Sequence, residues 1–238
     1  MNRSSLIIRS ALSALAVAGF VSAAQAQDGA QQEVEAIKAA MGKNAAAQHD
    51  YTWMETTAIA YKGEVKSTTT SSCQYVAGSN KPKCTVTSAP PEEKKQRGPM
   101  RRSIKDSKIE GMKEYMDSVK TLVGEYVPTK SELIQAAQGR GDVAVAQNPA
   151  DGTMKLTISN YLQKGDAVII TINGATKQVA HVAVNTWLND PSATVTLDVA
   201  FTTLPNGVSF ASTKTLTATA KEIVVTITDA NFALAVAQ

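Results

Sequence analysis

The chain has 238 residues, of which 43% are hydrophobic and 19% are charged. This length and balance suit one globular domain of ordinary size. Its 24 Lys and Arg residues exceed its 21 Asp and Glu residues by three, and only 5% of the residues are aromatic. The basic residues lack interleaved aromatics and a recognisable nucleic-acid-binding motif, so the composition argues against a nucleic-acid-binding protein.

The first 26 residues have the organisation of a secretory signal peptide. Two arginines precede an apolar run at residues 11–21, and Ala24-Gln25-Ala26 forms a small-residue cleavage site. The apolar run is shorter than the roughly 20 residues that span a bilayer. We therefore expect a mature chain that begins at Gln27 and is periplasmic or secreted. Without the two arginines it carries 22 basic and 21 acidic residues, so it is nearly neutral.

Residues 27–238 are predicted to form a single domain that opens with a helix and a group of strands. Residues 28–41 carry apolar side chains at intervals of three and four, which predicts an amphipathic helix ended by Gly42. Residues 51–76 are rich in Tyr, Trp, Thr, Ile and Val, which favour strands. Gly63 marks a turn or bulge within this region.

The two cysteines, Cys73 and Cys84, flank a turn-rich segment at residues 78–82. An even number of cysteines in an exported chain predicts a disulfide. A ring this short stabilises the fold by about 2–3 kcal/mol in the chain-entropy model. A metal site needs two further ligands, and the only histidines are His49 and His181. We interpret the pair as a structural disulfide rather than as a redox or metal site.

Residues 88–105 change in composition to Pro, Gly and charge, which is typical of a connector. Each basic residue near an anionic membrane surface contributes about 1 kcal/mol of binding, so a basic cluster in this connector is a candidate docking patch. Its partner is expected to be an anionic membrane surface or an acidic protein. The alternative is a solvated, charged connector. The cluster has six members without an intervening acid: Lys94, Lys95, Arg97, Arg101, Arg102 and Lys105.

Helices are predicted at about residues 106–138. The first has apolar residues at every third or fourth position and ends at Pro128. Thr129 and Glu132 resemble a capping box that opens a second, short helix. Residues 139–152 are then expected to be a loop.

From Thr153 onward the hydrophobic period becomes two, which predicts strands. The clearest half-buried strand alternates apolar and polar residues, and we expect its apolar side chains to form one wall of a hollow. Asn173-Gly174 predicts a two-residue hairpin, and the short connections make the strands antiparallel neighbours. The wall residues are Val195, Leu197, Val199 and Phe201, and the expected strands are 154–161, 167–172, 177–187, 193–203, 214–220 and 222–228.

The predicted fold class is α+β, with a large curved antiparallel sheet, or incomplete β-barrel, covered by an N-terminal helix and a central helical insertion. This order of elements resembles the periplasmic lipoprotein-carrier family, whose half-barrels are closed by helices around an apolar cavity that shields lipid. The resemblance covers most of residues 28–232. The carriers line their cavity with aromatics, whereas this chain has few. The segment Tyr51-Thr-Trp53-Met-Glu55-Thr also resembles uncharacterised exported bacterial proteins, which implies no activity.

No catalytic, cofactor or metal site is predicted. His181 has no linked nucleophile or carboxylate motif, and His49 lacks the further ligands that a metal requires. The sequence contains no convincing nucleophile elbow, zinc-protease helix motif, phosphate-binding loop or dinucleotide fingerprint. The strand carboxylates Glu55, Asp198 and Asp229 are expected to face solvent or to end hairpins. An enzyme with a dispersed site, such as a hydrolase, is therefore the least favoured class.

We expect a soluble, exported binding protein that holds a lipid or a lipidated polypeptide in a half-barrel cavity. The alternative is a non-enzymatic structural or interaction protein of the cell envelope, with a hollow filled by its own side chains. The expected partners are a lipid or lipoprotein, an anionic membrane surface or an acidic partner. No nucleic acid and no cofactor is expected.

Overall fold

The computed structural model describes residues 36–235 except for 38, 77–78, 80 and 89–98, and except for the side chains of residues 99–109. The predicted signal peptide lies outside the described residues, as do Lys94, Lys95 and Arg97 of the predicted docking patch.

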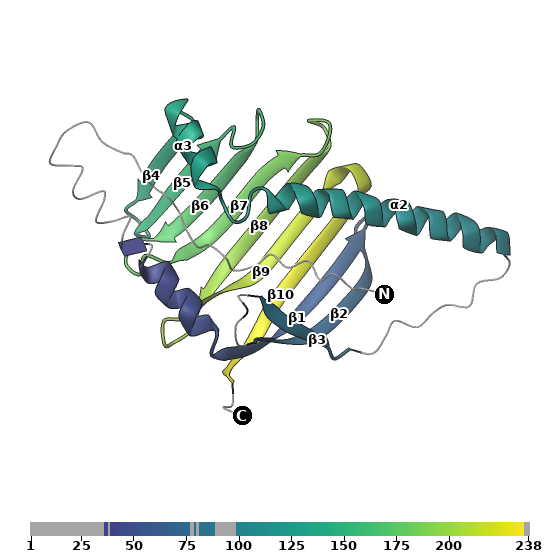
Figure 1. The fold of residues 1–238 in the computed structure, drawn as a ribbon, viewed down its shortest axis with the longest axis horizontal. Helices are drawn as coiled ribbons and strands as arrows, with labels where there is room; N and C mark the ends of the chain where they lie inside the picture. The colour runs from purple at the N-terminus through teal and green to yellow at the C-terminus, as the bar shows by residue number, and fades with distance from the viewer. Residues whose placement is uncertain (1–35, 38, 77–78, 80, 89–98, 236–238) are drawn as a thin grey trace.

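Ten strands form one antiparallel sheet in the order β3-β2-β1-β10-β9-β8-β7-β6-β5-β4. Strands that are consecutive in sequence are neighbours in the sheet except for β3 and β4, which lie at its two edges, and the first strand, β1, also pairs with the last, β10. The sheet is curved and open (Figure 1), which confirms the predicted α+β class with an unclosed antiparallel sheet. The strands are β1 (Tyr51–Tyr61), β2 (Glu64–Tyr75), β3 (Pro82–Val86), β4 (Val143–Asn148), β5 (Thr153–Ser159), β6 (Ala167–Asn173), β7 (Val179–Trp187), β8 (Thr194–Thr203), β9 (Ser209–Ala218) and β10 (Ile223–Leu234).

The described helices lie on one face of this sheet, as Figure 1 shows. They are an N-terminal helix (residues 36–37 and 39–48), α2 (Pro99–Gly124) and α3 (Ser131–Gly139). Apolar residues from all three helices pack with β5–β10 in one core cluster that includes Ile37, Val123 and Ile134. None of the helices that the structure describes is long and apolar enough to cross a membrane.

The structure departs from the predicted local signals at the end of the N-terminal helix and at the start of α3. The N-terminal helix continues past Gly42 to residue 48, where Asn44 and Gln48 hydrogen-bond the main chain of Ser209 on β9. The predicted capping box at Thr129 and Glu132 does not cap α3, whose N-cap residue is Lys130 and has no side-chain cap hydrogen bond.

The helix α2 begins at Pro99, within the segment predicted to be a connector up to residue 105. Proline is well tolerated in the first turn of a helix, because its missing N–H has no helical acceptor there and its φ is already helical. Arg101, Arg102 and Lys105 therefore belong to α2 rather than to a connector.

Residues 139–152 were expected to be a loop, but they contain the edge strand β4 (Val143–Asn148). Its residues are mostly exposed, so no alternation of buried and exposed positions reveals the strand in the sequence. The predicted two-residue turn at Asn173-Gly174 is also wrong. The Asn173 side chain accepts hydrogen bonds from the N–H groups of Ala175 and Thr176, and Lys177 takes the positive φ in a longer loop.

Candidate functional site

The concave face of the half-barrel is filled by side chains of the protein itself. Val195, Leu197 and Val199 are fully buried on β8, in the same cluster as Val123 of α2. Phe201 is partly buried against this cluster. The four predicted wall residues therefore lie where the alternation of β8 places them, and helix side chains pack against the same core.

A small pocket lies between the N-terminal helix and the strands β7, β8 and β9. Its volume is about 40 Å³, and its eight lining residues, which include Met41, Gln48, Val179, Phe201 and Ser209, are all uncharged. A cavity for a drug-sized or acyl-chain ligand has a volume of roughly 300 Å³ or more. The pocket as it stands accommodates no more than a few waters or a comparably small group.

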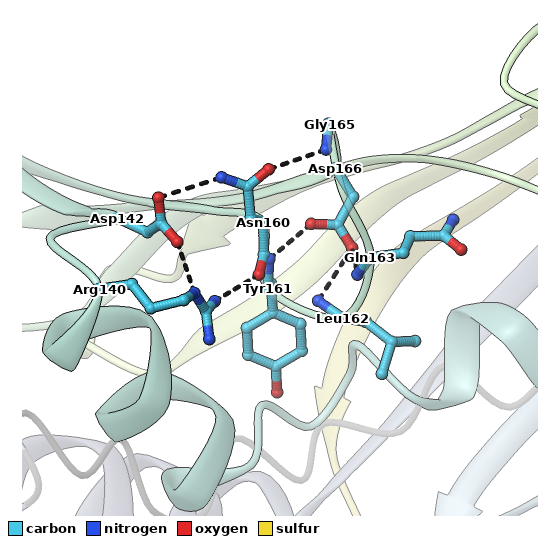
Figure 2. Close-up of polar contacts among 8 residues, drawn as sticks. All are labelled: Arg140, Asp142, Asn160, Tyr161, Leu162, Gln163, Gly165 and Asp166. Atoms are coloured by element: carbon cyan, nitrogen blue, oxygen red, sulfur yellow. Dashed lines mark hydrogen bonds and ion pairs between the residues drawn. The ribbon is translucent and has the colours of Figure 1, made fainter.

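A buried polar group with several hydrogen bonds is Asp166, which is only 2% exposed. Its carboxylate accepts hydrogen bonds from the N–H groups of Tyr161 (2.5 Å), Leu162 (3.0 Å) and Gln163 (2.8 Å), as Figure 2 shows. It also accepts a hydrogen bond of 2.6 Å from the hydroxyl of Tyr126. The Asp166 side chain is thus held by donors of the protein itself, and these bonds close the loop between β5 and β6.

This network continues to the neighbouring elements. The Tyr126 hydroxyl lies 2.7 Å from Thr186 Oγ1 on β7, and burial together with Asp166 raises the pKa of this tyrosine. The Tyr161 hydroxyl accepts a hydrogen bond of 2.6 Å from the N–H of Lys130, which precedes α3. These contacts fix the connection between α2 and α3 against the sheet, so we interpret the cluster as structural.

A second, half-exposed group supports the same loop from outside. Arg140 donates from Nε to Asp142 Oδ2 (2.7 Å) and from Nη2 to the Asn160 carbonyl (2.6 Å), both drawn in Figure 2. Asn160 donates to Asp142 Oδ1 and accepts from the N–H of Gly165. Asn160 has a positive φ of 50°, which asparagine adopts more readily than most residues. The turn-forming residues Lys164-Gly165-Asp166 are the local sequence signal for this loop.

Three charged residues meet on the sheet surface formed by β1, β10 and β9. Lys214 Nζ lies 2.7 Å from Asp229 Oδ2 and 4.0 Å from Glu55 Oε2, and the Lys214 side chain is only 7% exposed. Burial raises the pKa of both carboxyls, and the positive charge of Lys214 opposes this shift. The expectation that Glu55 and Asp229 face solvent or end hairpins is therefore wrong, because the β1–β10 register places them opposite each other beside Lys214.

The predicted disulfide between Cys73 and Cys84 is confirmed. The two residues are direct partners on β2 and β3, and a carboxylate oxygen of Glu55 and both sulfur atoms lie within 4.8 Å of one another. The sulfurs are bonded to each other, so they offer no thiolate to a metal in this state. Glu55 therefore lies beside both the disulfide and Lys214.

The two histidines lie apart from these groups. His181 on β7 pairs with Asp198 on β8 at 2.9 Å, with side-chain exposures of 36% and 59%. Such an exposed pair contributes at most about 1 kcal/mol. His49 stacks on Tyr75 with ring centroids 4.3 Å apart.

No family model matches the sequence, and no curated protein matches it. Among solved structures, the chain is similar to a DUF1329 family protein from Desulfovibrio piger ATCC 29098, with a TM-score of 0.41 and 8% sequence identity. The match covers 87% of this chain and 94% of that chain. The likeness to the lipoprotein carriers stays a prediction from element order, and the function must be inferred from the residues of this chain.

Proposed function

We propose that this chain is an exported, non-enzymatic interaction protein of the cell envelope, with a half-barrel that serves as a filled scaffold. The observation that carries the proposal is the packing of the concave face. Residues of α2 and α3 occupy it together with fully buried side chains of β5–β10. In the part of the chain that the structure describes, the pocket beside this core has a volume of about 40 Å³, which is too small for a lipid of ordinary size.

The proposed interaction surface is the basic segment from Lys94 to Lys105, and the proposed partner is an anionic membrane surface. Arg101, Arg102 and Lys105 belong to the first turns of α2, whose first turn contains no acidic residue. The positive end of the helix dipole lies at the same end, so it adds to the positive potential of these residues. In Figure 1 this end of α2 extends past the sheet edge formed by β2 and β3.

Vesicle co-sedimentation of the mature protein tests the proposal. We expect binding to vesicles that contain phosphatidylglycerol and none to pure phosphatidylcholine. At about 1 kcal/mol per charge, replacing Lys94, Lys95 and Arg97 by Ser weakens binding by roughly a hundredfold. A matched control replaces three exposed lysines elsewhere, Lys43, Lys155 and Lys221, and retains most of the binding. Equal losses in the two variants, or no binding by the parent, contradict the proposal; in the second case an acidic protein partner becomes the better hypothesis.

The second candidate is a carrier that holds a lipid or lipidated polypeptide, and the pocket beneath the N-terminal helix favours it. Met41, Val179 and Phe201 give this pocket an apolar lining. Native mass spectrometry of the exported protein tests this candidate. A co-purifying lipid that is lost in Ala45→Phe, which fills the pocket, and kept in Ala46→Phe, on the exposed side of the helix, supports it. A lipid-free mass for the parent contradicts it.

A further inference from the structure

The disulfide lies beside a half-buried acid, an arrangement that stapling two strands does not require. We propose that Cys73–Cys84 is a thiol–disulfide exchange site, in which an external thiol attacks the sulfur of Cys84 and Glu55 protonates the departing thiolate of Cys73. The inference is independent of the proposed membrane interaction, because it concerns the disulfide between β2 and β3 and involves none of the basic residues 94–105.

The two sulfurs differ in accessibility, which decides the direction of attack. Cys73 is 0% exposed on β2, whereas Cys84 is partly exposed on β3. The strand β3 is the last of the sheet on its side in the described part of the chain. Exchange requires access of a thiolate to one sulfur along the S–S axis, so Cys84 is the sulfur attacked and Cys73 is the leaving group.

A leaving thiolate at the position of Cys73 is buried and unpaired, which is costly. Glu55 is the nearest acid, with a carboxylate oxygen within 4.8 Å of both sulfurs. The charged groups that face Glu55 are Lys214 at 4.0 Å and Asp229, its direct partner on β10. Burial and the charge of Asp229 raise the pKa of Glu55 against the opposing effect of Lys214. The carboxyl therefore keeps its proton to a higher pH than an exposed glutamate.

The step balances with two equivalents of an external thiol as the reductant. The first thiolate bonds to Cys84 Sγ and the S–S bond breaks, with its electron pair passing to Cys73 Sγ. The Glu55 proton moves to Cys73 Sγ, which leaves a Cys73 thiol and a carboxylate. A second thiolate then attacks the external sulfur of the mixed disulfide and releases Cys84 as a thiolate, together with the oxidised external disulfide. The ligand class is a small thiol or a protein dithiol, and the reverse sequence oxidises it.

The fold supplies its own reporter for this reaction. Trp53 is 7% exposed and lies directly opposite Cys73 in the β1–β2 register. The chain contains two tryptophans, so Trp187→Phe leaves Trp53 as the single tryptophan, which can be excited selectively at wavelengths where tyrosine does not absorb. Because a disulfide quenches a neighbouring indole, reduction is expected to raise the Trp53 emission.

The experiment measures the second-order rate constant for reduction of the mature Trp187→Phe protein by dithiothreitol between pH 5 and pH 9, divided by the thiolate fraction of the reductant. We expect this normalised rate to fall as the pH rises through the pKa of Glu55. When Glu55→Gln is added to the Trp187→Phe protein, we expect a normalised rate that does not depend on pH. At acid pH this rate should be lower than that of the parent by about tenfold or more. Glu64→Gln, at an exposed position of β2, is the control and should follow the parent.

Three results would overturn the proposal. The first is equal, parallel profiles for the parent and Glu55→Gln. The second is a rate that does not depend on thiol concentration, since reduction then waits for unfolding of the whole protein. The third is a flat normalised profile for the parent alone, which decides the question even if Glu55→Gln does not fold.

Discussion

Truncation of Leu197 to Ala distinguishes a filled half-barrel from an open one. Leu197 is 1% exposed, and its direct partners on the neighbouring strands are Val184 and Leu216, both buried. Leu→Ala changes in packed cores cost about 2–5 kcal/mol, because the lost contacts add to the cavity left behind. For a domain of this size, a loss of about 3 kcal/mol lowers Tm by roughly 6–12 °C. Thermal and urea unfolding of the oxidised, lipid-free protein measure both quantities.

The same strand offers a matched control. Thr196 occupies the opposite face of β8, and its replacement by Ala should change stability by less than about 0.5 kcal/mol. If Leu197 faced an open, ligand-binding hollow, its truncation in the lipid-free protein would cost less than about 1 kcal/mol. A loss that small, or one as small as that of Thr196→Ala, would refute the filled scaffold.

Asp166→Ala leaves buried N–H groups and a tyrosine hydroxyl without their Asp166 acceptor, so it should lower the free energy of unfolding by about 3 kcal/mol or more. Tyr126→Phe should lower it by about 1–2 kcal/mol. A reversed order of the two losses in urea unfolding contradicts the network. Because burial raises the pKa of Glu55 and Asp229, these two carboxyls bind more protons in the folded protein than in the unfolded chain above about pH 4. Their contribution to stability should therefore fall as the pH rises toward their folded pKa values, and this fall should be smaller in Glu55→Gln; equal slopes in the two proteins contradict this. The intact mass of the exported protein should correspond to a chain that begins at Gln27 and lies two hydrogens below the reduced mass; a chain that retains Met1, or free thiols, contradicts the expected export.

The sheet was predictable where burial alternates along one strand. On β8 the odd-numbered residues from Val195 to Val199 are buried and the even-numbered ones are exposed or half-buried, which is the pattern that a period of two predicts. The edge strand β4 has mostly exposed residues on both faces, so its sequence carries no such pattern. The N-terminal helix continues past Gly42 because of contacts that are distant in sequence. Asn44 and Gln48 hydrogen-bond Ser209, which lies more than 160 residues further along the chain.

The disulfide was predictable because both of its determinants are local. Cys73 and Cys84 are close in sequence and flank a turn, which brings them together as strand partners. The acid beside them depends instead on the pairing of β1 with both β2 and β10. No sequence pattern specifies that the first strand of the chain pairs with the last one.

Part of the charged cluster could nevertheless be predicted from the sequence around Lys214. In the segment Thr213-Lys214-Thr215-Leu216, alternation places the lysine on the same face as Leu216, which is buried. A lysine on a buried face requires an anionic partner, because an unpaired buried ammonium is strongly disfavoured. That requirement predicts a carboxylate on an adjacent strand, and β10 supplies Asp229. The second carboxylate, Glu55, gives the cluster two acids for one ammonium, and burial raises the pKa of Glu55, which is the property that the proposed exchange step requires of it.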